Sequence, residues 1–212
     1  MESIAKRLVA LRIIPVLRLS SRDKARVAIE CLVEAGFETV EITLTTPDAV
    51  NLISELKSGM RADFLVGAGT LLDLESARQC IDAGADYLVS PCVVPGIGKL
   101  ARDARRLAIC GGFTPAEILA AWRESAGIVK VFPASTGGAA HLGALHAVYP
   151  QIPLCPTGGV SGANMAEYFK AGASVIGVGN NVIDQNALMT DNRQALIDHA
   201  RDFLDVAHRR DG

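Results

Sequence analysis

The sequence predicts an α/β fold, a compact (β/α)8 TIM barrel with a short N-terminal helix, and two observations support this prediction. Eight short apolar runs alternate with segments of helical periodicity along the chain. The runs recur at a spacing of roughly 15 to 25 residues, which is typical of repeated βα units. A doubly wound open sheet would show the same alternation, because the pattern does not encode the order of the strands.

The predicted strands are short and mostly apolar, as expected for parallel strands that are covered on both faces. They are residues 13–19, 39–45, 64–70, 87–92, 107–113, 128–134, 152–159 and 174–180. The segment before the first strand has arginines and lysines among its apolar residues and no small-residue cleavage site after it. It is therefore predicted to be an amphipathic helix that runs into the first strand, and not a targeting segment.

The clearest predicted helices are 21–36, 74–84, 115–127 and 162–172. Each ends on Ala-Gly, where a helix C-terminus favours a residue that tolerates the left-handed conformation. The prolines at 47 and 115 stand where helices are expected to begin. No low-complexity linker divides the chain, so residues 1–212 are predicted to form one barrel domain, with 207–212 as a solvated tail.

Composition excludes several classes of function. The chain has 212 residues, half of them apolar, and a net charge of −2, so it has no basic field to attract nucleic acid or an anionic membrane. No apolar run approaches the length of a membrane span, about 20 residues. The five cysteines are scattered and have no metal-like spacing with the four histidines, which predicts no metal site. We expect reduced core thiols in a cytoplasmic protein.

A lysine interrupts the sixth predicted strand. In the run "IVKVF", Val129 and Val131 point to one face and Lys130 and Phe132 to the other, because strand side chains alternate. In a barrel the valines would meet the helix layer, and Lys130 would point into the interior. The second strand shows the same feature, because Glu41 alternates with apolar residues.

Strands two and six lie opposite each other in an eight-stranded barrel, whose diameter is about 15 Å. Lys130 and Glu41 would therefore approach each other across the interior and leave room for a small molecule. One interpretation is a structural ion pair, which would stabilise the fold little. The interpretation that we favour is catalytic. A desolvated lysine loses its proton more readily, its free amine forms a Schiff base with a carbonyl, and a carboxylate nearby can move the protons.

At these residues the sequence resembles a known family. It is similar, over nearly its whole length, to the 2-keto-3-deoxy-6-phosphogluconate (KDPG) aldolase / 4-hydroxy-2-oxoglutarate (KHG) aldolase family, class I pyruvate-dependent aldolases of (β/α)8 fold. The segments that carry the resemblance are, in order, "IIPVLR", "VEITLTTPDA", "VGAGTLLD", "ADYLVSP", "GGFTPAEI", "VKVFPAS", "CPTGGVS" and "GVGNNVI". The combination is specific, although no single segment is.

The resemblance implies a role for particular residues. Lys130 corresponds to the Schiff-base lysine and Glu41 to the general acid/base. Thr70 matches a threonine that helps to hold the pyruvate carboxylate, and Pro91 and Phe132 match positions in the pocket wall. The region that holds the substrate's phosphate matches Thr157, Gly158, Gly159, Gly179 and Asn180. Glycines after strands seven and eight of a barrel independently suggest a phosphate cradle, although they would also suit tight turns.

The sequence departs from many members at one position. Thr45 stands where they have an arginine for the substrate carboxylate. Other members combine threonine there with "VLR" on the first strand, as this chain does, so Arg18 is expected to replace that cation; the alternative is a solvated loop arginine. Asn180 stands where some members have serine.

The expected function is cleavage of 2-keto-3-deoxy-6-phosphogluconate to pyruvate and glyceraldehyde 3-phosphate through a lysine imine, with no metal or other cofactor. The same chemistry on 4-hydroxy-2-oxoglutarate or 2-keto-3-deoxy-6-phosphogalactonate is the close alternative. A phosphosugar isomerase or a non-catalytic phosphate-ligand-binding barrel is the more distant one. The resemblance also implies a homotrimer.

Overall fold

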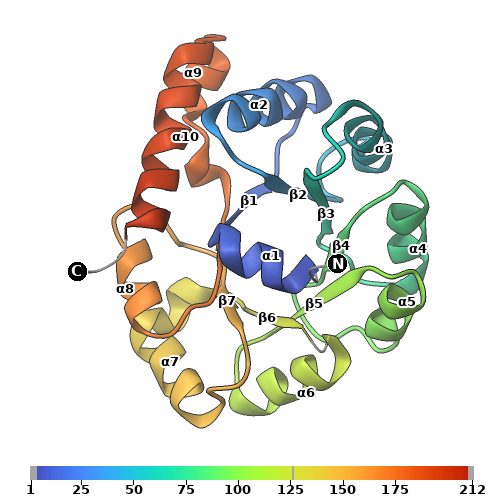
Figure 1. Ribbon diagram of the computed structural model, residues 1–212, viewed down its shortest axis with the longest axis vertical. Helices are drawn as coiled ribbons and strands as arrows, with labels where there is room; N and C mark the ends of the chain where they lie inside the picture. The colour runs from blue at the N-terminus through green and yellow to red at the C-terminus, as the bar shows by residue number, and fades with distance from the viewer. Residues whose placement is uncertain (1–3, 126, 210–212) are drawn as a thin grey trace.

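The computed structural model describes residues 4–125 and 127–209, and it shows a barrel of eight parallel strands surrounded by helices (Figure 1). Every predicted strand is present, although most are shorter than the apolar runs. The strands are β1 (Ile13–Leu17), β2 (Thr39–Thr43), β3 (Leu65–Gly69), β4 (Tyr87–Val89), β5 (Leu107–Gly112), β6 (Ile128–Val131), β7 (Leu154–Pro156) and β8 (Ile176–Val178).

Helices follow the strands in regular alternation and form the outer layer. They are α1 (Ile4–Leu11), α2 (Arg22–Ala35), α3 (Ala49–Gly59), α4 (Leu74–Asp82), α5 (Ile97–Asp103), α6 (Pro115–Ser125), α7 (Ala134–Val148), α8 (Met165–Lys170), the 3₁₀ helix η1 (Asn180–Val182), α9 (Gln185–Met189) and α10 (Arg193–His208). Pro115 begins α6 as predicted, whereas α3 begins two residues after Pro47. Among the described residues, no helix is both long and apolar enough to cross a bilayer.

The strand order confirms a barrel and not a doubly wound sheet. Neighbours in the sheet are neighbours in the sequence from β1 to β7, and β8 pairs with β1. The remaining seam, between β7 and β8, carries two isolated bridges, Leu154↔Ala173 and Thr157↔Gly177, so the barrel is nearly closed. All eight carboxyl ends therefore meet at one mouth, where side chains from distant parts of the sequence can form a single site.

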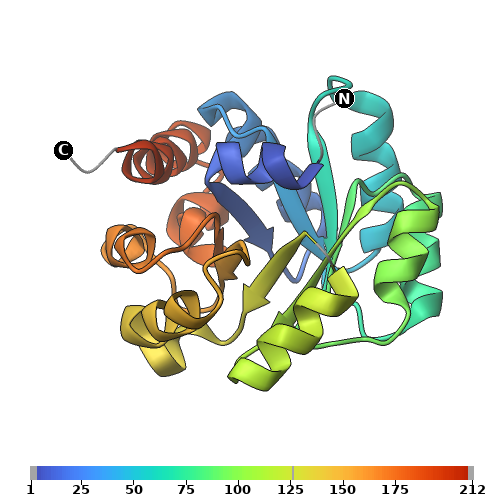
Figure 2. The same cartoon turned by 60° about the horizontal axis from the view of Figure 1, so that its bottom comes forward.

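Apolar residues form two separate cores, one on each face of the sheet. The larger core lies between strands and helices and contains Val40 as well as Val129 and Val131, the two valines predicted to face outward. The smaller core fills the barrel interior and includes Ile14, Val16, Leu65, Tyr87, Ile109 and Ile128. Helix α1 crosses the amino end of the barrel (Figure 2) and inserts the fully buried Leu8 into this inner core.

The caps of α2 show why the sequence forms its helices where it does. The Ser21 hydroxyl accepts a hydrogen bond from the Lys24 N–H, and Gly36 ends the helix in the left-handed region with φ of 109°. Gly84 and Gly172 also adopt positive φ after their helices, as predicted. An L-residue at these positions would be strained.

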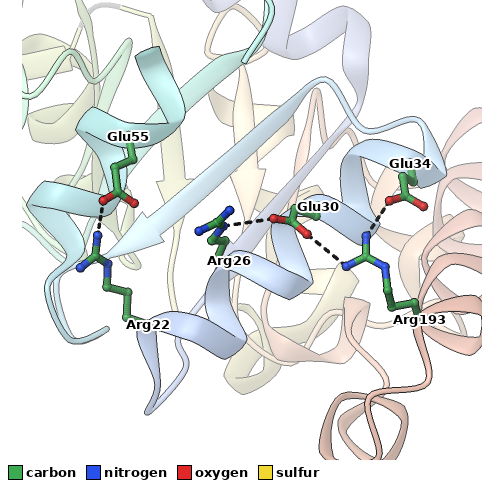
Figure 3. Close-up of polar contacts among 6 residues, drawn as sticks. All are labelled: Arg22, Arg26, Glu30, Glu34, Glu55 and Arg193. Carbon is green, nitrogen blue, oxygen red and sulfur yellow. Dashed lines mark hydrogen bonds and ion pairs between the residues drawn. The ribbon is translucent and has the colours of Figure 1, made fainter. Parts of the chain in front are cut away.

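Ion pairs on the outer surface connect α2 to the helices on either side (Figure 3). Arg22 pairs with Glu55 of α3, and Arg193 of α10 pairs with Glu30 and Glu34 of α2. These side chains are between 36% and 54% exposed. Because exposed pairs contribute little, we attribute the position of α2 mainly to its buried apolar face, which includes Ile29 and Leu32.

Two sequence-based expectations are wrong. The expected tail begins too early, because α10 continues to His208 and Ala207 is buried; residues 210–212 lie outside the described residues. Cys92 is exposed, unlike the other four cysteines, because it follows Pro91 beyond the end of β4.

Candidate active site

Lys130 and Glu41 meet inside the barrel from strands β6 and β2. The Lys130 Nζ lies 4.0 Å from the Glu41 Oε1, and the two side chains are 9% and 4% exposed. The Lys130 Nζ also lies 5.3 Å from the centre of the Phe132 ring. Both groups occupy the inward positions that strand alternation predicts, each at the third residue of its strand.

The Glu41 carboxyl is buried and incompletely bonded. Its Oε1 atom has no hydrogen-bond partner. Burial raises the pKa of this carboxyl, and the Lys130 and Arg18 cations oppose the rise without cancelling it. A carboxyl of this kind keeps its proton closer to neutral pH than an exposed one, which suits a group that must both take and give a proton.

Glycines on neighbouring strands make room for these side chains. A Cβ atom at Gly69 of β3 would lie 2.0 Å from the Glu41 Oε1, and one at Gly177 of β8 would lie 2.3 Å from the Thr157 Oγ1. Below the site, a Cβ atom at Gly67 would lie 2.1 Å from the buried Tyr87 ring. Each of these three large inward-facing side chains therefore lies against a glycine on a neighbouring strand.

A cavity of about 300 Å³ opens beside Lys130 at the mouth of the barrel. It is lined by Val16, Arg18, Lys130, Phe132, Thr157, Gly158, Gly159, Gly179, Asn180 and Asn181. Seven of these had been singled out for substrate binding and Lys130 for catalysis. The structure thus gathers one amine, one guanidinium and two glycine-rich turns around a volume that suits a small anionic molecule.

The two glycine-rich turns follow β7 and β8. Gly158 and Gly159 both adopt positive φ, 92° and 79°, and a Cβ atom on Gly159 would lie 2.4 Å from the Ser135 Cβ. Gly179 precedes η1, and a Cβ atom there would contact nothing within 4 Å. The Gly158–Gly159 turn thus depends on glycine for its backbone and its packing, whereas Gly179 leaves open space.

Arg18 lines the cavity together with these turns, and its side chain reaches Thr70. Arg18 follows β1, and its Nη2 atom lies 3.5 Å from the Thr70 Oγ1. Thr70 follows β3 and has a φ of 63°, an uncommon backbone conformation for a threonine. The structure places Thr45 outside the cavity: it is exposed, and its hydroxyl lies 2.8 Å from that of Thr43.

Phe132 separates this cavity from a second one, of about 310 Å³. Pro91 lines the second cavity together with Phe132, and not the cavity of Lys130. Cys92 and Glu117 also line it. The two expected wall residues therefore do share a cavity, but Phe132 alone borders both.

Sequence reasoning did not identify every residue at the mouth. Val16 of β1 also lines the cavity. It lies two residues before Arg18, so strand alternation places both side chains on the same face, and the sequence alone could have identified it. Gly69 and Gly177 leave space for Glu41 and Thr157, and this role can be recognised only once the pairing of the neighbouring strands is known. The part of the chain that the structure describes contains no cluster of three metal-ligating side chains.

Chemically, the site can form and use an imine. The Lys130 amine faces a cavity, and an acid stands 4.0 Å from it. Arg18 can hold a carboxylate, and backbone N–H groups of glycine turns can hold a second anion. Water is largely excluded from the pair because both side chains are buried.

Comparison with known proteins supports this interpretation. A family model described as KDPG and KHG aldolase matches residues 4–198. The chain is 34% identical to a probable 2-dehydro-3-deoxy-6-phosphogalactonate aldolase of Rhizobium meliloti, over 87% of this chain and 88% of that one. It is 30% identical to a 2-dehydro-3-deoxy-phosphogluconate aldolase of Haemophilus influenzae, over 97% of each.

A solved structure is similar over almost the whole barrel. KDPG aldolase from Legionella pneumophila, with pyruvate captured at low pH as a covalent carbinolamine intermediate, has a TM-score of 0.85 and is 25% identical. The match covers 95% of this chain and 98% of that one. In that relative, pyruvate forms the covalent species that precedes an imine.

Proposed function

The chain belongs to the KDPG and KHG aldolase family of class I pyruvate aldolases, which are lyases, and from this premise we propose that it cleaves 2-keto-3-deoxy-6-phosphogluconate to pyruvate and glyceraldehyde 3-phosphate. The observation that carries the proposal is the buried pair of Lys130 and Glu41, whose Nζ and Oε1 atoms lie 4.0 Å apart beside the cavity. An imine-forming amine and a proton-transfer group are what this reaction needs.

The proposed reaction begins with attack by the Lys130 amine on the C2 ketone. The resulting carbinolamine loses water to give a protonated imine, and Glu41 supplies the proton for the departing water. The Glu41 carboxylate then takes the proton of the C4 hydroxyl as the C3–C4 bond breaks, and the electron pair of that bond enters the enamine. Glyceraldehyde 3-phosphate leaves, C3 is protonated, and water hydrolyses the imine to pyruvate and free Lys130.

The remaining residues would hold the two anionic ends of the substrate. We assign Arg18 and Thr70 to the carboxylate, because their side chains meet beside the pair. Thr157, Gly158, Gly159 and Gly179 are assigned to the region of the phosphate, at the turns after β7 and β8. Phe132 forms the wall between the cavities, Pro91 lines the second one, and Thr45 lines neither.

The phosphogalactonate epimer is a second candidate substrate. The relative of Rhizobium meliloti is a probable 2-dehydro-3-deoxy-6-phosphogalactonate aldolase, and 2-dehydro and 2-keto name the same group. The epimers differ in the orientation of one hydroxyl, and a single hydrogen bond can separate them by about 1–3 kcal/mol. Values of kcat/KM for the two epimers and for 4-hydroxy-2-oxoglutarate would identify the preferred substrate.

Borohydride trapping with pyruvate tests the proposed chemistry. Reduction should leave one covalent adduct on the intact protein, and peptide mapping should place it on Lys130. The Lys130→Ala variant should fold, form no adduct and lose kcat/KM by several orders of magnitude. Lys99→Ala is the matched control, because Lys99 is an exposed lysine that pairs with Asp103. An adduct on another lysine, or a Lys130→Ala variant with near-normal turnover, would contradict the proposal.

We also propose a homotrimer as the assembly, following the family resemblance. Large apolar side chains are exposed at Leu72, Val148 and Met189, at 62%, 63% and 73%. Burial of such side chains against other copies of the chain would remove apolar area from water. Light scattering coupled to size exclusion should give three times the 22.3 kDa of one chain.

A further inference from the structure

The side chain of Asn180 connects β8 to β1 at the mouth of the barrel. Its Oδ1 atom accepts a hydrogen bond of 3.1 Å from the Arg18 N–H, and its Nδ2 atom donates one of 2.7 Å to the Arg18 carbonyl. Both polar atoms of one amide are thus bonded to the backbone of one residue. Asn180 is itself only partly exposed.

This contact occurs where the regular strand pairing stops. The β1–β8 ladder pairs Ile13 with Ile176, Ile14 with Gly177 and Pro15 with Val178. A proline has no N–H to continue a ladder. Beyond it, the Asn180 amide supplies one donor and one acceptor to Arg18, as a backbone peptide of a longer β8 would. The amide therefore holds the end of β1 at the seam with β8.

The residue held in this way is the cation of the proposed carboxylate site. Arg18 has a long and exposed side chain, so the position of its guanidinium depends on a fixed backbone. Its Nη2 atom lies 3.5 Å from the Oγ1 of Thr70, which follows β3. A shift of the Arg18 main chain would move the guanidinium away from Thr70.

We propose that Asn180 is a positioning residue for Arg18, and that its side chain serves the carboxylate end of the keto acid and not the phosphate end. This inference rests on the proposed function, because it takes Arg18 as the partner of the carboxylate. An amide that turned toward a phosphate would break both bonds to Arg18. A serine hydroxyl, with a single oxygen on a shorter side chain, would not span the N–H and the carbonyl together.

Pyruvate separates the two possible roles because it has the carboxylate and the ketone but no phosphate. Asn180→Ala should raise the pyruvate concentration that gives half-maximal borohydride trapping at Lys130 by about 5- to 10-fold. This is the size expected when the hydrogen bonds that hold the Arg18 backbone are lost. In the synthetic direction, the KM for pyruvate should rise likewise, while the KM for glyceraldehyde 3-phosphate stays within about twofold.

A double variant tests whether Asn180 acts through Arg18. Arg18→Ala should weaken pyruvate trapping at least as much as Asn180→Ala, and combining the two should add little to Arg18→Ala alone. Asn192→Ala is the matched control: its side chain caps α10, where it accepts a hydrogen bond from the Ala195 N–H outside the site. That variant should lose some stability and keep wild-type pyruvate trapping.

The outcomes distinguish this inference from the proposed function. A raised KM for glyceraldehyde 3-phosphate with unchanged pyruvate trapping would make Asn180 a phosphate ligand and overturn the inference. Additive losses in the double variant, or equal trapping defects in Asn180→Ala and Asn192→Ala, would overturn it as well. A wild-type protein that forms no adduct at Lys130 would instead reject the proposed function, and the inference with it.

Discussion

At the scale of the residue, Glu41 is held in a position that costs stability. Its carboxyl is buried inside the barrel, its Oε1 atom has no hydrogen-bond partner, and the net effect of its surroundings raises its pKa. Buried polar atoms normally have a partner, and exceptions concentrate at functional sites. An orphaned acceptor that faces a lysine is therefore consistent with a group that must exchange protons with a substrate.

This arrangement predicts how Glu41→Gln changes stability with pH. Because the folded pKa of Glu41 is raised, its contribution to stability is full below the unfolded value, about 4.3, and is lost as pH rises through the folded value. Glutamine resembles the protonated acid and does not titrate. The Tm of Glu41→Gln relative to the wild type should therefore increase from about pH 5 to pH 8, by roughly 2–4 °C if the effect is near 1 kcal/mol.

Glu117→Gln provides a control of opposite sign. Hydrogen bonds from the Thr114 and Phe113 N–H groups lower the pKa of Glu117, so its contribution is present above the unfolded value and is lost as pH falls. The Tm of Glu117→Gln relative to the wild type should therefore increase as the solution is acidified. If the Glu41→Gln series followed the same direction, attraction to Lys130 and Arg18 would outweigh burial, contrary to our interpretation.

The sequence predicted the central residues of the site, but not their surroundings. Alternation alone placed Lys130 and Glu41 on the inward faces of β6 and β2, and the structure agrees. Alternation does not identify the other residues that surround Lys130. In the structure Val131 belongs to the outer core, Pro133 is exposed, and the cavity beside Lys130 is bordered by Val16 of β1. Such neighbours depend on strand pairing, which local patterns do not specify.

At the scale of the element, α1 closes the amino end of the barrel, opposite to the site. Leu8 is 0% exposed and packs in the inner core with Leu65 and Ile128, which begin β3 and β6. Glu41 and Lys130 lie farther along their strands. The packing of α1 that stabilises the barrel and the proposed catalytic pair thus lie toward opposite ends of the barrel.

Leu8→Ala should separate these two properties. Removing a fully buried leucine costs about 2–5 kcal/mol and should lower Tm by roughly 2–4 °C for each kcal/mol. The KM at low temperature should stay near the wild-type value, because the site is at the other end. Lys99→Ala is the control, since the Lys99 side chain is 75% exposed and its truncation should change stability by less than about 0.5 kcal/mol. Equal shifts in Tm for the two variants would show that α1 does not close the barrel.

Elements with clear periodicity and clear ends were predictable, and irregular ones were not. The sequence 21–36 has a serine N-cap and a glycine C-cap, and it forms α2 almost as predicted. The segment that forms α7 contains Gly138, whose φ of 63° interrupts the helix, so its periodicity is weak. Helix α9 and η1 have five and three residues, too few to show a period.

At the scale of the whole molecule, the alternation of strands and helices predicted the barrel but not the closure of its last seam. Eight alternating units led to a barrel whose strand order follows the sequence, from β1 to β8. The pattern does not say how the last seam closes. It is closed by isolated bridges between β7 and β8, and the side chain of Asn180 bonds to Arg18 beyond the last β8–β1 pair. These contacts depend on side chains and on barrel geometry, which a linear period does not contain.

The reactivity of the cysteine thiols measures whether the barrel interior is closed to solvent. Cys31, Cys80, Cys110 and Cys155 are buried, while Cys92 is exposed beside the second cavity. Burial raises the pKa of Cys80 and Cys155 to about 11, so these thiols are both shielded and protonated near neutral pH. Iodoacetamide at mildly alkaline pH should therefore modify the native protein once, at Cys92, whereas the denatured protein should be modified at all five cysteines. Peptide mapping after intact-mass measurement checks this, and Cys92→Ser, which should remain unmodified in the native state, is the control. Rapid native labelling of Cys155, which lies within the inner core, would show that the cylinder opens to solvent and that the enclosed Lys130–Glu41 pair is not the resting structure.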